Sequence, residues 1–249
     1  MGEPVETLEG WWVLHDFRRV DWQAWRRWPE TDRAAAMDEL VRLVQGWEQL
    51  QAAHEGDFAL YRVAGNREDL LFLHFRPAFD ELEAAKTALN KTRLGDILRP
   101  GYSYVSVVEL SGYLAGGKPA DPRSPELRAR LEPPVPAARH VCFYPMTKRR
   151  QGADNWYMLP RSQRAVLMRS HGAIGHKYAE QVVQLISGSQ GLDEWEWGVT
   201  LFADDPLAFK KIVYEMRFDE ASARYADFGP FLVGTRLPGA ELRAYLALR

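Results

Sequence analysis

Cysteine is almost absent from this sequence of 249 residues. The single cysteine, Cys142, cannot form an internal disulfide and cannot supply the several thiolates of a cysteine metal cluster. No apolar run approaches the ~18 residues that a membrane-spanning helix requires. We therefore expect a protein of a reducing compartment, the cytoplasm, without a membrane span.

An excess of charge of one sign is also lacking. The formal net charge is −2, which gives no global electrostatic reason to expect nucleic acid as a partner. Hydrophobic residues make up 46% of the chain and charged residues 27%, proportions typical of a globular protein. Composition leaves open whether the chain forms one large domain or two smaller ones.

Several common functional motifs are missing as well. The sequence has no G-x-G-x-x-G after a predicted strand, no phosphate loop, no H-E-x-x-H and no G-x-S-x-G. The dinucleotide-binding, nucleotide-binding, zinc-protease and serine-hydrolase classes therefore have no support from motifs.

Hydrophobic periodicity predicts the order β-α-β-β-α-β for the first half. Apolar and β-branched runs predict strands at 7–17, 57–64, 69–75 and 102–110, and a spacing of three to four residues between apolar positions predicts helices at 30–53 and 79–90. The region 114–138 then carries six prolines and is predicted to be a linker.

The same order is predicted to return after the linker. Strands are expected at 139–146, 182–189, 194–203 and 231–235, and helices at 160–180 and 206–228, with Gly172 and Gly175 breaking the first of these helices. Repetition of a whole unit indicates two ferredoxin-like α+β halves, 1–113 and 139–249. Because each sheet must bury its second face, we expect the halves to form an α+β barrel.

Three side chains of the second half suggest chemistry, although each has an ordinary structural alternative. His171 precedes Gly172 where the helix is expected to break, and it is either a metal ligand or a buried hydrogen-bonding group. Tyr144 ends a strand and is followed by Lys148, which suggests either a half-buried ring beside a solvated loop or a reactive phenol beside an anion site. Spacing alone does not choose between these alternatives.

Six segments of the second half carry a more specific signal. They read Phe-Tyr-Pro-Met-Thr-Lys at 143–148, Asn-Trp-Tyr-Met-Leu-Pro at 155–160, His-Gly at 171–172, Gly-Ser at 188–189, Leu-Asp-Glu-Trp-Glu-Trp-Gly-Val-Thr-Leu-Phe at 192–202 and Tyr-Glu-Met-Arg-Phe-Asp-Glu at 214–220. Together they resemble the coproheme decarboxylases of the chlorite dismutase-like superfamily. The first half resembles that family more weakly, through element order and Ser-Gly-Tyr at 111–113.

The resemblance implies an enzyme of haem biosynthesis. Such an enzyme uses hydrogen peroxide to decarboxylate two propionates of iron coproporphyrin III (coproheme) to vinyl groups, which yields protohaem b, and the substrate is its own redox cofactor. The resemblance also implies the paired ferredoxin-like fold, a homopentamer and a coproporphyrin ferrochelatase as a possible partner.

Roles for individual residues follow from matching positions. His171 would be the proximal iron ligand, Tyr144 the phenol that becomes a radical and takes hydrogen from a propionate, and Lys148 the group that binds or protonates that propionate. Gln184 would lie at the distal position, where chlorite-decomposing relatives place an arginine, so it argues against chlorite as the substrate. The family's propionate contacts match Tyr113, Arg130, Arg217 and Ser222, and its macrocycle-lining positions match Met146, Trp156 and Trp197.

Two alternatives accompany this hypothesis. The same pocket could serve a non-catalytic haem or porphyrin carrier, in which Tyr144 and Lys148 would be dispensable. It could also serve a chlorite dismutase or a peroxidase-like enzyme.

Overall fold

The computed structural model describes residues 3–112 and 124–248 of the chain. The chain divides into two compact units, which we call the N-terminal unit (Trp11–Val105 with Val233–Arg249) and the C-terminal unit (Met1–Gly10 with Ser106–Leu232). Each unit thus receives a terminal segment from the opposite end of the chain. The boundaries predicted at 113 and 138 do not appear in this division, and the placement of a linker at 114–138 stays a prediction.

The N-terminal unit has an antiparallel sheet with the order β11–β2–β3–β1–β4. In chain order its elements are β1 (Thr7–Val20), α1 (Trp22–Arg27), α2 (Glu30–Glu48), α3 (Leu50–Ala53), β2 (Asp57–Val63), β3 (Leu70–Arg76), α4 (Phe79–Lys91), η1 (Arg93–Asp96), β4 (Leu98–Ser111), β11 (Leu232–Arg236) and α9 (Gly239–Leu246). The short helices α1 and α9 were not predicted.

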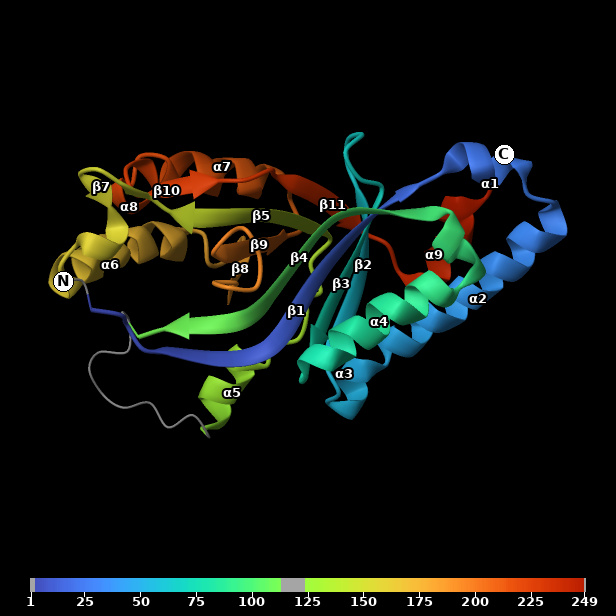
Figure 1. The fold of residues 1–249 in the computed structure, drawn as a ribbon, viewed down its shortest axis with the longest axis horizontal. Helices are drawn as coiled ribbons and strands as arrows, with labels where there is room; N and C mark the ends of the chain where they lie inside the picture. The colour runs from blue at the N-terminus through green and yellow to red at the C-terminus, as the bar shows by residue number, and fades with distance from the viewer. Residues whose placement is uncertain (1–2, 113–123, 249) are drawn as a thin grey trace. The chain divides into compact units, whose positions relative to one another are not determined.

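The core of the N-terminal unit lies between this sheet and its helices. Helix α2 contacts β2, α4 contacts β3, and α9 contacts α2 (Figure 1). Apolar side chains of these elements form one buried cluster that includes Trp47, Phe58 and Phe72. The buried indole of Trp25 donates a hydrogen bond to the carbonyl of Leu246 at 2.8 Å, which ties α1 to α9.

The C-terminal unit repeats the strand order of the first sheet. Its elements are α5 (Pro125–Leu131), β5 (His140–Lys148), β6 (Arg150–Gln151), β7 (Asp154–Asn155), η2 (Trp156–Met158), α6 (Arg161–Lys177), β8 (Val183–Gly188), β9 (Trp197–Ala203), α7 (Leu207–Met216), α8 (Glu220–Ala223) and β10 (Ala226–Phe228). The order β8–β9–β5–β10 is the counterpart of β2–β3–β1–β4, and the end of β4 pairs with β8. The predicted α+β fold with two ferredoxin-like halves is therefore confirmed.

Two predictions about helices of the C-terminal unit were wrong. Helix α6 runs without a break through Gly172 and Gly175, because an interior glycine costs a helix only about 1 kcal/mol relative to alanine. The helix predicted at 206–228 is instead α7, then α8 capped by Asp219, then strand β10. In the part of the chain that the structure describes, no helix combines the length and apolar character needed to span a membrane.

Candidate functional site

Strand β5 directs the predicted catalytic side chains to one face of the C-terminal sheet. Tyr144, Met146 and Lys148 alternate along the strand, so their side chains project from the same face. Met146 is paired with Trp197 on β9, and side chains directly opposite in an antiparallel pair share a face. Residues of β5 and β9 that are far apart in sequence therefore share one surface. We call this surface, formed by Tyr144, Met146, Lys148 and Trp197, the site face.

Strand β8 adds Gln184 and Ile186 to the site face. Gln184 is paired with Leu201 and Ile186 with Val199, and these two β9 residues are paired in turn with Cys142 and Tyr144 on β5. Gln184 is exposed, and its Nε2 donates a long hydrogen bond of 3.4 Å to the carbonyl of Gly175 on α6. The site face is thus directed toward α6.

His171 is held by a carboxylate at the start of α8. Its Nδ1 lies 2.9 Å from Oδ2 of the buried Asp219 and 3.4 Å from Oγ of Ser222. The backbone N–H of Ser222 donates to the same carboxylate oxygen at 3.2 Å, as expected for an aspartate at the N-cap of a helix. When Nδ1 carries the proton and donates this hydrogen bond to Asp219, Nε2 of the neutral imidazole keeps its lone pair. Nε2 is then the ring atom that can bind a metal.

Asp219 has a second carboxylate oxygen that does not contact His171. Its second oxygen, Oδ1, is buried and has no hydrogen-bond partner in the structure. Oδ2, in contrast, makes both the contact with His171 and the cap of α8.

Lys148 is close to the His171–Asp219 pair. Its Nζ donates to the carbonyl of Ala221 on α8 at 3.0 Å and lies 4.3 Å from the ring centroid of the buried Trp156. Burial lowers the pKa of Lys148 to about 8, while the carboxylates of Asp219 and Glu196 oppose this change. Lys148 can therefore exchange a proton close to neutral pH.

Tyr144 lies in an aromatic environment. Its ring stacks on Phe231 with a centroid separation of 4.3 Å and lies 5.9 Å from the ring of Phe228. The guanidinium of Arg217 lies 3.9 Å from the centroid of Phe228. Burial raises the pKa of the Tyr144 phenol, and Cys142 adds to the rise while Arg217 opposes it. The phenol is therefore neutral at physiological pH.

The remaining predicted residues differ in how closely they approach this cluster. Trp156 contacts Lys148 directly, Trp197 and Met146 lie on the site face, and Ser222 is buried beside His171. Arg217 is exposed next to the rings that surround Tyr144. Arg130 is exposed on α5, and no described contact joins it to the other predicted residues. Tyr113 lies outside the residues that the structure describes.

Sequence reasoning missed two carboxylates of the site. Asp219 is the partner of His171, and an aspartate directly before the helical residues Glu220–Ala223 is an N-cap signal that the prediction of a long helix obscured. Glu196 accepts a hydrogen bond from the backbone N–H of Lys148 at 2.9 Å, a contact across 48 positions with no local signature.

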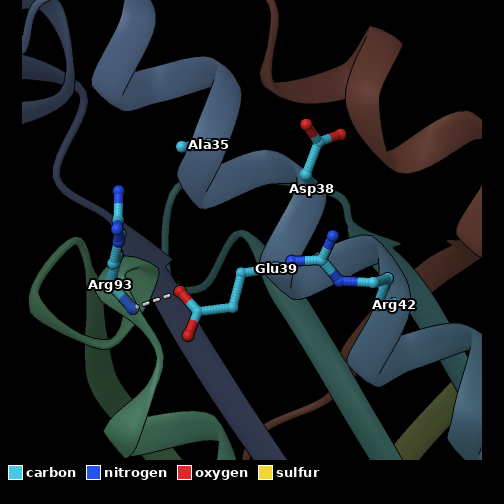
Figure 2. Close-up of a pocket in the computed structure, with 5 residues that line it drawn as sticks. All are labelled: Ala35, Asp38, Glu39, Arg42 and Arg93. Atoms are coloured by element: carbon cyan, nitrogen blue, oxygen red, sulfur yellow. Dashed lines mark hydrogen bonds between the residues drawn. The ribbon is translucent and has the colours of Figure 1, made fainter.

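Other polar features of the described chain do not form a second catalytic cluster. A hollow of about 320 Å³ on the N-terminal unit is lined by Ala35, Asp38, Glu39, Arg42 and Arg93, and Glu39 accepts a hydrogen bond from the backbone of Arg93 at 2.9 Å (Figure 2). Its lining is dominated by charged surface side chains, and none of the predicted site residues belongs to it. Across residues 3–112 and 124–248, no group of three or more His, Cys, Asp or Glu side chains could by itself hold a metal ion.

Comparison with known proteins identifies the family. The family model described as chlorite dismutase matches residues 33–237. The chain belongs to the chlorite dismutase family. Within this family, the chain is 54% identical over 246 residues to a protein of Thermus thermophilus named coproheme decarboxylase, and the match covers 99% of this chain and 98% of that protein.

Solved structures of chlorite dismutase family proteins have the same fold. A structure described as a novel haem-binding protein from Thermus thermophilus is 53% identical, with a TM-score of 0.94, and the match covers 100% of this chain and 99% of that one. A chlorite dismutase from Candidatus Nitrospira defluvii is 22% identical, with a TM-score of 0.79 and coverage of 96% for both chains. At that identity the second similarity establishes the fold alone.

Proposed function

We propose that this member of the chlorite dismutase family is a coproheme decarboxylase, which oxidatively removes two propionate carboxyl groups of iron coproporphyrin III with hydrogen peroxide as oxidant. The observation that carries the proposal is the 54% identity, over nearly the full length of both chains, to the protein of that name. The arrangement of His171, Tyr144 and Lys148 around one sheet face supports it independently.

His171 suits an iron that arrives within a porphyrin. The macrocycle supplies four nitrogen ligands, so one imidazole is sufficient on the protein side, and the lack of a larger ligand cluster among the described residues is compatible with this. We assign Nε2 of His171 to the iron and Asp219 to orienting the ring through Nδ1. The carboxylate makes the imidazole more basic, which tunes the bond to the metal.

Tyr144 and Lys148 would carry out the reaction at a propionate. Bound iron and peroxide would supply the oxidising power. The Tyr144 phenol would lose an electron and a proton to that oxidant, and the resulting radical would take a hydrogen atom from the propionate β-carbon. Loss of a second electron to the same oxidant, together with loss of carbon dioxide, would then leave the vinyl group. For each propionate carboxylate, one peroxide and one proton are consumed, and one carbon dioxide and two waters are formed.

The proton balance gives Lys148 a specific task. An acid beside the substrate must supply one proton for each turnover, and an ammonium with a pKa of about 8 can do so near neutral pH. The same ammonium can pair with the propionate before reaction. This pairing offsets the free-energy cost of burying the Lys148 charge beside Trp156.

The remaining assignments complete the site. Gln184 would orient peroxide on the distal side, where an amide supplies no positive charge for chlorite. Tyr113, Arg130, Arg217 and Ser222 would bind propionates, and Met146, Trp156 and Trp197 would line the macrocycle. We further propose a cytoplasmic homopentamer that exchanges porphyrin with a coproporphyrin ferrochelatase.

Peroxide titration of the purified protein loaded with iron coproporphyrin III tests the function. The proposal predicts release of two carbon dioxide molecules per porphyrin, with saturation at two equivalents of peroxide. Stable binding without gas release would instead indicate a carrier, and oxygen release from chlorite would indicate a chlorite-decomposing enzyme. Either result would overturn the proposal.

A further inference from the structure

Glu109 places a carboxylate on the site face, although no family motif identified in the sequence includes it. It lies on β4, two residues after Val107, which is paired with Gly188 on β8. Gly188 is paired in turn with Trp197 on β9. Since paired residues and alternate residues of a strand share a face, Glu109 and Trp197 project from the same surface as Tyr144.

The Glu109 carboxylate is bound directly to the Trp197 indole. Nε1 of Trp197 donates to Oε1 of Glu109 at 3.3 Å, and this is the only partner of that N–H among the residues that the structure describes. Both side chains are half-buried. A tryptophan that lines an apolar pocket can rotate about two side-chain torsions, and one hydrogen bond at the ring edge removes much of that freedom.

Gly188 allows this contact to form. A Cβ atom at position 188 would lie 2.4 Å from Oε2 of Glu109, closer than real Cβ contacts. The Glu109 carboxylate therefore lies directly over the backbone of Gly188, next to the Trp197 indole that donates a hydrogen bond to it. A side chain at position 188 would displace the Glu109 carboxylate.

The surroundings of Glu109 shift the pKa of its carboxyl group. Burial raises that pKa, the hydrogen bond from Trp197 opposes the rise, and the nearby carboxylate of Glu9 adds to it. A carboxyl group has an oxygen that can accept a hydrogen bond in either protonation state, so the contact with Trp197 does not depend on the charge of Glu109.

We propose that Glu109 is a positioning residue of the porphyrin site, which fixes the orientation of the Trp197 indole against the macrocycle. This inference rests on the proposed function, because it assumes that the site face binds porphyrin. Glu109 acts through Trp197 and takes no part in the chemical step. Its loss therefore weakens porphyrin binding more than it slows decarboxylation of bound substrate.

Three variants, Glu109→Leu, Glu109→Gln and Trp197→Phe, test the proposal through the affinity for iron coproporphyrin III measured by Soret titration. Glu109→Leu removes the acceptor and should weaken binding about 10-fold, which corresponds to one lost hydrogen bond. Glu109→Gln retains a carbonyl acceptor and should restore most of that loss. Glu109→Leu added to Trp197→Phe should cost little more than Trp197→Phe alone, because both remove the same contact.

Two further measurements keep failure of the inference distinct from failure of the proposed function. The indole N–H resonance of Trp197 in protein labelled with ¹⁵N-tryptophan should shift in Glu109→Leu and much less in Glu109→Gln, whether or not porphyrin is added. Thermal unfolding of each variant checks that the fold is retained.

Different results refute the proposed function and the positioning role of Glu109. If the wild-type protein binds no porphyrin, the proposed function fails and the inference fails with it. If the wild type decarboxylates coproheme while Glu109→Leu binds it as tightly as wild type, or while Glu109→Gln is as impaired as Glu109→Leu, only the positioning role is refuted.

Discussion

Replacement of Asp219 by asparagine tests the electrostatic core of the site. The substitution keeps the shape of the side chain and an oxygen that can accept from Nδ1 of His171, now 2.9 Å from Oδ2. It removes the negative charge that makes the imidazole a stronger ligand and that helps to keep the nearby Lys148 ammonium protonated. The fold should survive because asparagine is also a good N-cap residue.

The magnitude follows from the type of hydrogen bond lost. A hydrogen bond to a charged partner contributes about 1.5–3 kcal/mol and a neutral one about 1 kcal/mol, so the difference is about 0.5–2 kcal/mol. That difference corresponds to a roughly 2- to 30-fold weaker affinity for iron coproporphyrin, which overlaps the range usual for residues that orient a metal-bound histidine. Because Asp219 raises the pKa of Lys148, that pKa should also fall below about 8.

Soret titration at neutral pH measures the affinity, and the wavelength of the ligated band reports the strength of the histidine–iron bond. Asp227→Asn is the matched control, since Asp227 pairs with Arg149 at 2.9 Å on a partly exposed surface and the substitution removes the same charge. The control should bind porphyrin like the wild type. Unchanged affinity and an unchanged spectrum in Asp219→Asn would refute the assignment of Asp219 as the group that tunes His171.

Three other predictions concern separate parts of the site. Tyr144→Phe should preserve porphyrin binding and abolish carbon dioxide release, and residual release near the wild-type rate would contradict the radical role. The decarboxylation rate of the wild type should fall as pH rises through about 8, because the protonated fraction of Lys148 decreases; in Lys148→Met this limb of the pH–rate profile should disappear and the rate should be low throughout. Gly175→Ala should leave the midpoint of thermal unfolding unchanged or slightly raised, since alanine favours the helix by about 1 kcal/mol, while the new Cβ, 3.0 Å from Nε2 of Gln184, displaces the amide and slows the reaction with peroxide; an unchanged peroxide rate would argue against the contact between Gly175 and Gln184.

The regular elements were predictable because their signals are local. Strand β3 (Leu70–Arg76) is mostly apolar and α4 (Phe79–Lys91) has apolar residues along one helical face, and both lie within a residue or two of their predicted bounds. The break predicted at Gly172 is absent because an interior glycine costs a helix only about 1 kcal/mol, and α6 also packs against α7 and α8. The exchange of terminal segments between the two units was not predictable, since it depends on long-range contacts such as the hydrogen bond from Gly112 to the carbonyl of Glu6.

The sequence suggests the reactive groups of the candidate site more readily than the side chains that contact them. Tyr144, Lys148 and His171 stand out through their residue type and their family motifs. Asp219 contacts His171 across 48 positions and Glu109 contacts Trp197 across 88 positions, and only strand register and the turn before α8 bring these partners together. A local signal marks Asp219 as a helix cap, but no local signal shows that it contacts His171 or that Glu109 contacts Trp197.

Decarboxylation of iron coproporphyrin through residues of the site face would change the mass of the porphyrin. Mass spectrometry of the porphyrin recovered after peroxide addition therefore reports substrate and reaction together. We predict a product in which two of the four propionates have become vinyl groups. Recovery of porphyrin that still carries all four propionates, from protein shown to bind it through His171, would refute the proposed function.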